Sequence, residues 1–495
     1  MGSRRAATVA AGVLLVIACS PRIASPPPLP PPPPPPARLP APVARPDTTA
    51  VARTPSPPVE PDAPPTVLPT IRGGARGGAR TAPAGVAGAG RSGLTPSLSG
   101  PSDVVARVAV ASRLPAASFS GLAEWTLEYA GDGGAVRVPA NETLTITKAG
   151  AQLRVQSAGG ASQSPRGAAV ILRPASSEDA ILYAGKRYRG ELRVSPTDTG
   201  LLIMNRIGVE DYLRGVVPLE IGNRPSSELA AAQAQAIAAR SYVYVRIRAR
   251  RAAPYDILSD VREQVYGGVE AERATTDEAV ASTVGLVLLY SGQLVDAPYH
   301  STCGGSTAAP SEVWRGRSDL PYLQAVSDRI PGTDRFWCDG SASFRWTRTM
   351  EQRELATTIA RYLRQYMAGA PADPGLVREL VEGNRTTSGR LASLTVVTQR
   401  GSYALRGNDM RFVLRAPNGQ ILNSTDVSVA TTRGAGGALR SAIFRGAGNG
   451  HGVGMCQWGA IGRARAGHSA QEILAAYYVG TSVARVNETD LRSPR

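Results

Sequence analysis

The sequence predicts an α+β protein in which a strand-rich module and then a mixed α/β core follow a disordered, proline-rich linker. Prolines and glycines dominate the chain before about residue 103. From about 104 to 200, short segments alternate apolar and polar residues, which is typical of half-buried strands. Beyond 200, a long helical pattern lies among strands and glycine-rich turns. The predicted divisions are a signal peptide (1–18), the linker (19–103), the strand-rich module (104–200), the core (201–485) and a tail (486–495).

The N-terminus has the pattern of a lipoprotein signal. Arg4 and Arg5 precede an apolar stretch from Ala6 to Ala18, and Cys19 follows the small Ala18. We expect cleavage before Cys19, diacylation of that cysteine and stable anchoring of an exported protein to a membrane, facing the periplasm or cell wall. The alternative is an ordinary signal peptide with an incidental cysteine.

The linker and the charge restrict the class of partner. A proline run is expected to form a semi-rigid polyproline II spacer, and the glycine-rich RGGARGGAR is expected to be flexible coil. The formal charge is +16, and almost all of it is arginine. Such a charge usually suggests nucleic acid, but export argues against that partner and favours an anionic cell envelope.

The core is expected to begin with a strand at 201–207 and a short helix at 209–216. A long helix runs from near Ser227 to about Arg250, with Glu228 in its first turn and arginines in its last, as the helix dipole favours. The remaining expected elements are a helix near 350–370, strands at 393–399 and 410–416, and a last helix at 470–480.

Two glycine-rich turns carry most of the chemistry-bearing residues, APYHSTCGGST (297–307) and GAGNGHGVGMCQWGA (446–460). Glycine gives such loops backbone angles closed to other residues. The chain has only three histidines, and two of them, His300 and His451, lie in these turns. Either histidine could make only a structural hydrogen bond, but together they indicate a shared site.

Glu220 is the most informative acidic residue, because it follows an apolar run and lies between Leu219 and Ile221. A buried carboxylate without a partner is unfavourable by several kcal/mol or becomes protonated. Glu220 is therefore either an ionised residue at a turn or a carboxyl group with a raised pKa.

Five segments, in order, resemble the stage II sporulation protein D (SpoIID/LytB) family, and the resemblance extends from about residue 188 to residue 480. The segments are YLRGVVPLEI, ELAAAQAQAIAARSYV, QVYGG, YHSTCGGST and GHGVGMCQWGA. The resemblance implies a peptidoglycan lytic transglycosylase that cleaves glycan strands, with Glu220 as its catalytic acid. One departure is that the family usually continues the glutamate motif with Met-Pro, where this chain has Ile221 and Gly222.

The implied reaction needs one carboxyl group. Glu220 would protonate the glycosidic oxygen between N-acetylmuramic acid and N-acetylglucosamine, and the glutamate would then take the proton of the muramic C6 hydroxyl as a 1,6-anhydro ring closes. Apolar neighbours would keep the acid protonated near neutral pH. No cofactor is required. The resemblance also implies a set of substrate-binding residues: Gln235, Arg240, Gln264, Tyr266, His300, Ser301, His451 and Gln457. For Arg240, packing against a nearby acid is an equally good interpretation.

After Cys19, three cysteines remain: Cys303, Cys338 and Cys456. An odd number in an oxidising compartment leaves at least one thiol free, metal-bound or paired between chains. A Cys303–Cys338 disulfide suits an exported protein best. A zinc ion bound through His300, Cys303 and Cys338 is the second interpretation, and a cysteine nucleophile is the third.

Two further functions compete with the transglycosylase. One is a non-catalytic protein that binds peptidoglycan and recruits or stimulates a cell-wall amidase. The other is a lysozyme-like hydrolase, for which Glu210, Asp211 or Glu228 would have to supply a second carboxylate.

Overall fold

The structure is a computed structural model that describes residues 97–98, 104–131, 134–160 and 167–486. The predicted signal peptide, the Cys19 lipidation site, nearly all of the linker and nearly all of the tail lie outside these residues. None of the helices in the described part of the chain is both long and apolar enough to cross a membrane.

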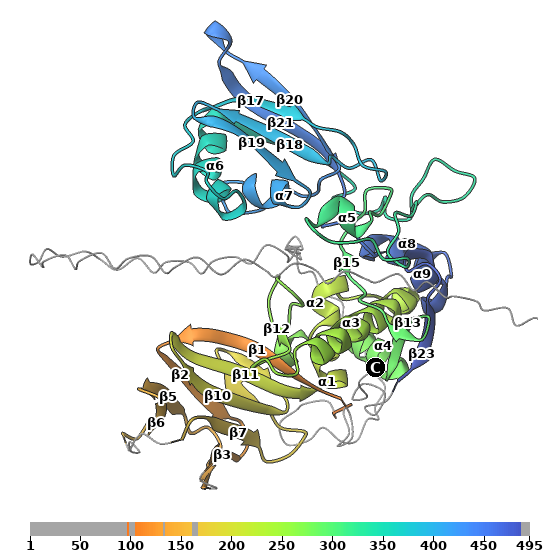
Figure 1. Ribbon diagram of the computed structural model, residues 1–495. Coiled ribbons are helices and arrows are strands. Elements are labelled where there is room, and N and C mark those ends of the chain that lie inside the picture. The colour runs from red at the N-terminus through yellow and green to blue at the C-terminus, as the bar shows by residue number, and fades with distance from the viewer. Residues whose placement is uncertain (1–96, 99–103, 132–133, 161–166, 487–495) are drawn as a thin grey trace, which may run out of the picture. The chain divides into compact units, whose positions relative to one another are not determined.

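The region after the linker is built on two sheets that are antiparallel except for one strand pair (Figure 1). The five-stranded sheet has the order β6-β5-β2-β8-β9, and the seven-stranded sheet has the order β12-β1-β11-β10-β7-β3-β4. Burial alternates along strands such as β3 and β5, as the alternating sequence predicts. The strands are β1 (Val105–Leu114), β2 (Ala116–Gly121), β3 (Trp125–Tyr129), β4 (Ala135–Val138), β5 (Leu144–Ala149), β6 (Gln152–Ser157), β7 (Val170–Pro174), β8 (Ile181–Tyr183), β9 (Lys186–Tyr188), β10 (Glu191–Thr197), β11 (Gly200–Gly208) and β12 (Ile257–Leu258).

The helical region is joined directly to the larger sheet. β11 pairs with β1 along its whole length and leads into the first helix without a loop. β12 returns to pair in parallel with β1, and the Asp256 carboxylate beside it accepts hydrogen bonds from the backbone and guanidinium of Arg107. One continuous hydrophobic core therefore underlies both the sheets and the helices.

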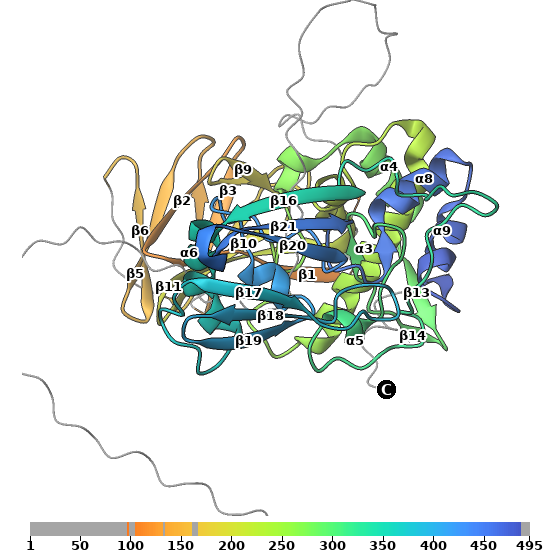
Figure 2. The same ribbon diagram turned by 90° about the horizontal axis from the view of Figure 1, so that it is seen from above.

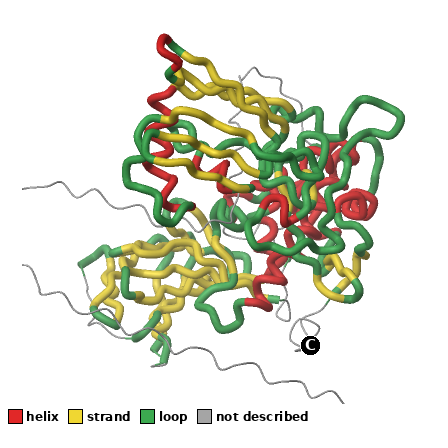
Figure 3. Tube along the Cα trace, turned by 45° about the horizontal axis from the view of Figure 1, so that its top comes forward, coloured by secondary structure: helices red, strands yellow, loops and turns green. Residues whose placement is uncertain are grey.

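The helices gather around α3, the expected long helix, and the red helical segments of this region lie together in Figure 3. α3 is buried on most of its sides. Its many alanines permit this, because small side chains allow helices to approach from several directions. The elements are α1 (Val209–Arg214), α2 (Val217–Ile221), η1 (Ser226–Glu228), α3 (Leu229–Ala249), η2 (Gly268–Ala271), α4 (Ala274–Ser282), β13 (Leu286–Tyr290), β14 (Gln293–Leu294), β15 (Tyr299–His300), α5 (Pro310–Val313), β22 (Met455–Cys456), α8 (Gln457–Arg465), α9 (Ala470–Tyr477) and β23 (Ser482–Arg485). This mixture confirms the predicted α+β class.

Residues 345–447 form an inserted module with a hydrophobic core of its own. Its two three-stranded sheets have the orders β16-β21-β20 and β17-β18-β19 (Figure 2). The chain enters and leaves at neighbouring points, because the Gly448 N–H donates to the Phe344 carbonyl at 3.2 Å. The elements are β16 (Arg345–Glu351), α6 (Gln352–Tyr366), β17 (Val377–Glu382), β18 (Ser393–Thr398), β19 (Gly401–Arg406), α7 (Asp409–Val413), β20 (Val427–Arg433), η3 (Ala435–Gly437) and β21 (Leu439–Ala447).

One expected element is wrong: the strand at 410–416 is the short helix α7 followed by a loop. Met410, Phe412 and Leu414 alternate with other residues, as in a half-buried strand. However, the intervening Arg411 is also fully buried, because its guanidinium donates to the Leu422 carbonyl at 2.9 Å and to Asn408 Oδ1 at 3.1 Å. Because both sides of this segment are buried, the alternation of its apolar residues does not distinguish a strand from a helix.

Candidate active site

Glu220 lies on the last turn of α2, a helix held close to the QVYGG segment. Gly215 separates α1 from α2, and a Cβ atom there would come within 2.5 Å of the Tyr266 ring, so only glycine allows this approach. Gly222, with a φ of +80°, ends α2. The Glu220 N–H still donates to the Val216 carbonyl at 3.1 Å. The departure at Ile221 and Gly222 therefore leaves the glutamate on an intact helical turn.

Glu220 is 5% exposed. The Val265 N–H donates to its Oε1 at 3.1 Å, and the Gln457 side chain also forms a hydrogen bond with it. Burial raises the pKa of Glu220 to about 7, while these two hydrogen bonds oppose the rise by favouring the ionised form. A carboxyl with this pKa exchanges its proton near neutral pH, as a general acid requires.

A hydrogen-bonded group of neutral side chains lies beside this carboxyl. Tyr212 donates to Gln264 Oε1 at 3.0 Å, and Gln264 Nε2 donates to the Tyr299 hydroxyl at 2.9 Å. Burial, followed by the charge of Glu220, raises the pKa of both tyrosines well above the usual value. Gln264 is thus fixed between two tyrosines that stay protonated.

The pairing of β15 with β22 brings the two glycine-rich turns together. Tyr299 pairs with Met455, and His300 pairs with Cys456. Gly454, with a φ of +71°, permits this contact, because a Cβ atom there would lie 2.0 Å from the Pro298 carbonyl oxygen. Gln457 follows directly, at the start of α8, and the strand pair therefore delivers its side chain to Glu220.

Two of the predicted substrate-binding amides meet at the acid. Gln457 Nε2 donates to Gln235 Oε1 at 3.2 Å, which joins α8 to α3 beside Glu220. Gln235 is fully buried, and its Nε2 has no hydrogen-bond partner among the described residues. This donor is therefore available to a ligand atom that accepts beside the acid.

The histidines and Ser301 line the joined turns. His300 Nδ1 lies 3.2 Å from the Val453 carbonyl oxygen, and its Nε2 has no partner within the described part of the chain. His451 Nδ1 accepts from the Val453 N–H at 3.0 Å, and burial lowers the pKa of His451 to about 3. His451 is therefore a neutral residue that shapes its own loop. The Ser301 hydroxyl lies 3.3 Å from that of Thr302.

Two predicted substrate-binding residues have structural partners instead. Arg240 is fully buried and forms two hydrogen bonds with Glu210, from Nε to Oε1 at 2.9 Å and from Nη2 to Oε2 at 2.6 Å. The alternative interpretation of Arg240, pairing with an acid, matches this arrangement. Tyr266 is 3% exposed and donates to Asn205 Oδ1 at 2.9 Å, in the core beneath α1.

The three acids considered as a second carboxylate are all paired with arginines. Glu210 binds Arg240. Asp211 Oδ1 accepts from the Leu98 N–H at 2.9 Å and from Arg214 at 3.3 Å. Glu228 binds Arg465 at 2.8 Å and Arg224 at 3.3 Å. These ion pairs attach the three acids to the scaffold, whereas the Glu220 carboxyl accepts from two neutral donors, the Val265 N–H and the Gln457 side chain.

The described cysteines lie in neither of the first two expected arrangements, a Cys303–Cys338 disulfide and a zinc ion with His300 as a ligand. Cys303 Sγ and Cys338 Sγ are 3.4 Å apart, well beyond the ~2.05 Å of a disulfide bond, and all three described cysteines are free. His300 is not part of this group either, since its ring faces Val453. The group instead comprises Cys303, Cys338, Cys456 and Asp328.

Comparisons with known proteins cover the segment that contains Glu220. Residues 197–290 match the family model described as stage II sporulation protein, and this segment contains Glu220, Gln235 and Gln264. Stage II sporulation protein D of Bacillus subtilis is 26% identical over 346 residues, which cover 66% of this chain and 88% of that protein. These matches support the resemblance to the SpoIID/LytB family that the motifs indicate.

Two other proteins are similar to this chain. An uncharacterized protein of Brachyspira hyodysenteriae is 27% identical over 319 residues, which cover 63% of this chain and 77% of the relative. The amidase enhancer of Bacillus subtilis is 29% identical over 308 residues, which cover 55% of this chain but only 40% of that protein. Residues 330–454, most of which form the inserted module, match a domain of unknown function.

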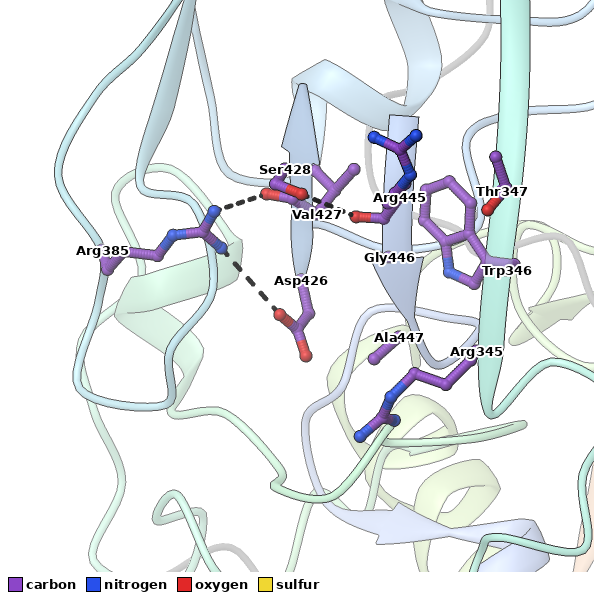
Figure 4. Close-up of a pocket in the computed structure, with 10 residues that line it drawn as sticks. All are labelled: Arg345, Trp346, Thr347, Arg385, Asp426, Val427, Ser428, Arg445, Gly446 and Ala447. Atoms are coloured by element: carbon purple, nitrogen blue, oxygen red, sulfur yellow. Dashed lines mark hydrogen bonds and ion pairs between the residues drawn. The ribbon is translucent and has the colours of Figure 1, made fainter. Parts of the chain in front are cut away.

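The inserted module carries a pocket of about 620 Å³ that shares no residue with the Glu220 group. Figure 4 shows Arg345, Arg385 and Arg445 around it, with the Trp346 ring along one side and Asp426 opposite. Arg345 also donates to the Gly304 carbonyl at 2.9 Å, so this pocket borders the first glycine-rich turn.

Sequence reasoning missed Asp328 and the Val265 N–H. Asp328 lies in an ordinary polar segment, VSDRIPG, and only the folded chain shows that it meets three cysteines. The Val265 contact is made by the backbone, so no residue type could signal it. The side chain of its neighbour Gln264, in contrast, was found through the motif.

Proposed function

We propose that this protein is a peptidoglycan lytic transglycosylase in which Glu220 alone serves as general acid and then general base. The observation that carries the proposal is the raised pKa of Glu220, about 7, produced by burial among neutral groups. The matched family and the sporulation relatives support a role at the cell wall.

A single carboxyl group is sufficient for this reaction and for few other glycan cleavages. A hydrolase of the usual kind needs a second free carboxylate, either as nucleophile or as base. The three candidates for that role form ion pairs with arginines. An intramolecular attack by the muramic C6 hydroxyl removes the need for a second acid.

In the proposed steps Glu220 gives up one proton and then takes one back, so it ends the reaction protonated, as it began. The protonated carboxyl donates to the bridging oxygen as the glycosidic bond breaks, which releases the N-acetylglucosamine hydroxyl. The resulting carboxylate, stabilised by Val265 N–H and Gln457, then accepts the C6 hydroxyl proton as that oxygen bonds to C1. Positioned acid–base catalysis of this kind contributes about 10²–10⁴-fold.

The unpartnered buried atoms identify candidate substrate contacts. Gln235 Nε2 lies beside the acid and would donate to a sugar or acetamido oxygen, and His300 Nε2 would contact a hydroxyl group. Each contact would remove the unfavourable free energy of a buried polar atom without a partner.

The test is mass spectrometry of products after the protein lacking residues 1–96 digests peptidoglycan and, separately, glycan strands without stem peptides. This truncation keeps the Leu98–Asp211 contact. We expect 1,6-anhydro-muramic ends from the parent and from Glu278→Gln, a matched change at an exposed position on α4, but not from Glu220→Gln. Reducing ends would instead demand a hydrolase with a second carboxylate.

A second candidate function is a non-catalytic one, because one relative is an amidase enhancer. In that case the protein would bind peptidoglycan and stimulate a cell-wall amidase. If neither substrate is cut while the protein sediments with purified cell walls and accelerates an amidase equally in parent and Glu220→Gln, the enzyme proposal fails and this one stands.

We also propose that the chain is exported and anchored through a lipid at Cys19, on the basis of its N-terminal sequence. The test is metabolic labelling with a fatty acid followed by fractionation of the cell. The Cys19→Ala variant is expected to lose the label and the association with membranes. Equal labelling of parent and variant would contradict the proposal.

A further inference from the structure

Four side chains of types that bind metal ions meet in the interior, and none of them belongs to the Glu220 group. Cys303 follows β15, Asp328 and Cys338 lie between α5 and β16, and Cys456 ends β22. One ligand atom from each lies within 4.8 Å of the others, and none of the four residues is measurably exposed. The segments that meet here are up to 153 residues apart in the chain, so the cluster does not arise from a local turn.

The spacing fits a tetrahedral ion better than it fits a disulfide or simple packing. Ligand bonds of about 2.3 Å for sulfur and about 2.0 Å for oxygen put tetrahedral S···S and S···O distances near 3.8 Å and 3.5 Å. The Cys303–Cys338 sulfurs are 3.4 Å apart, and Cys303 Sγ lies 3.5 Å from Asp328 Oδ2. A disulfide between any two cysteines would leave the third thiol and a buried carboxyl group without a function.

The surroundings of the cluster are arranged for negatively charged ligands. Cys456 Sγ accepts from the Cys303 N–H at 3.1 Å and from the Gly459 N–H at 3.3 Å, and Cys303 Sγ accepts from the Gly305 N–H at 3.4 Å. Such backbone donors stabilise thiolates.

The carboxylate ligand is oriented in the same way. Asp328 Oδ1 accepts from the Tyr477 hydroxyl at 2.7 Å and lies 3.5 Å from the Arg463 guanidinium, so Oδ2 is the oxygen that faces the sulfurs. Outer contacts of this kind orient the ligands of metal sites.

We propose that Cys303, Asp328, Cys338 and Cys456 bind one zinc ion. Three thiolates and one carboxylate favour zinc over the hard cations magnesium and calcium, and four protein ligands leave no position open for substrate. The ion is therefore structural. It joins the two glycine-rich turns and fixes the β15–β22 pair, from which Gln457 reaches Glu220. The proposal does not depend on the transglycosylase activity.

The test measures metal directly in the full chain. Elemental analysis is expected to give about one zinc per chain for the parent. The Cys456→Ser variant is expected to lose most of it. The matched control is His300→Ala, which changes a buried neighbour outside the ligand set and is expected to keep the zinc. Loss of zinc in His300→Ala together with retention in Cys456→Ser would overturn the ligand assignment.

Cobalt substitution tests the geometry even if a variant folds poorly. The parent with Co²⁺ is expected to show a sulfur-to-cobalt charge-transfer band and the strong visible bands of tetrahedral cobalt. Asp328→Cys would add a fourth thiolate and raise the charge-transfer intensity by about one third, because the intensity follows the number of Co–S bonds. Octahedral cobalt bands, iron in place of zinc, or a metal-free parent with a Cys303–Cys338 disulfide would each overturn the proposal.

Discussion

Burial of Glu220 has two effects: it makes the ionised carboxylate unfavourable for the stability of the fold, and it raises the pKa into the range that suits an acid catalyst. Its pKa is raised from 4.5 to about 7 by burial, so the folded protein binds this proton more tightly than the unfolded chain does. The stabilising effect of the bound proton is fully present below pH 4.5 and is lost as pH rises through about 7. Above that pH the fold carries an ionised, buried carboxylate.

Glu220→Gln should therefore stabilise the protein above neutral pH. The amide keeps an oxygen that can accept from Val265 but cannot ionise. Each pKa unit corresponds to about 1.4 kcal/mol, so the gain above pH 7 is on the order of 3 kcal/mol. Urea unfolding at pH 4 and pH 8 measures it. The stability difference should be small at pH 4 and large at pH 8, and a difference independent of pH would show that the raised pKa is not its cause.

Gln457 is expected to influence the pKa of Glu220. Its hydrogen bond lowers the pKa of Glu220, so Gln457→Met is expected to raise that pKa further. Because the protonated form starts the reaction, kcat/KM of the parent should fall above about pH 7, and this falling limb should move to higher pH in the variant.

The pH profile of glycan cleavage measures this change in the pKa of Glu220. The matched control is Gln233→Met, the same change on α3 at a residue that bonds Ser282 at the surface. A limb that stays in place in Gln457→Met while activity falls would assign Gln457 a purely structural role.

The site residues show what a motif can and cannot predict. The motifs place Gln235, Gln264 and Gln457 near the acid, as the structure has them. They cannot state the direction of a side chain: Arg240 turns to Glu210, an acid 30 residues earlier in the chain. The fourth member of the metal cluster, Asp328, has no sequence signal because its partners are distant in the chain.

At the scale of elements, the Arg240–Glu210 pair is the buried link between α1 and α3. Both side chains are almost completely buried, and Arg240 also donates to the Leu286 carbonyl at 3.0 Å, which attaches β13. Arg240→Met should reduce the free energy of unfolding by about 3–5 kcal/mol, because Glu210 would be left buried without its partner.

Denaturant unfolding of the single and double variants separates the contribution of the ion pair to stability from the contribution of side-chain packing. Adding Glu210→Gln to Arg240→Met should recover part of the loss, since the uncompensated charge disappears. A loss below about 1 kcal/mol in Arg240→Met would contradict the structural role and favour the substrate contact implied by the resemblance.

The elements also show where periodicity succeeds. The strands of the N-terminal sheets are predicted from alternation, because one side of each strand meets water. The long helix α3 is predicted from the residue types at its ends, because one end of the helix meets water. In α7 every residue from Met410 to Val413 is buried, so the polar side that the pattern needs is missing. Periodicity fails where burial is uniform.

At the scale of the whole molecule, the chain contains an insertion that local patterns did not reveal. Residues 345–447 build their own hydrophobic core, separate from the core shared by the sheets and helices. The sequence shows helices and strands there but no composition change at either boundary. The boundary exists because Phe344 and Gly448 meet, a contact across more than 100 residues.

The insertion should be removable. Arg345 and Ala447 are antiparallel partners, whose Cα atoms in such a pair lie about 5 Å apart, so replacing residues 346–446 with Asn-Gly would close the gap with a two-residue turn. The shortened chain is expected to fold, because its own core is intact. It should be less stable, because Arg390 of the module is buried and donates to the carbonyls of Cys303 and Ser306.

Circular dichroism and thermal unfolding of the shortened chain test this expectation beside Arg390→Met in the full chain, which removes only the guanidinium. Hydrogen bonds to a charged group contribute about 1.5–3 kcal/mol, so both variants should unfold at lower temperature than the parent and by similar amounts. If Arg390→Met is mildly destabilised while the shortened chain does not fold, the module is an integral part of the fold, and the two hydrophobic cores form one cooperative unit.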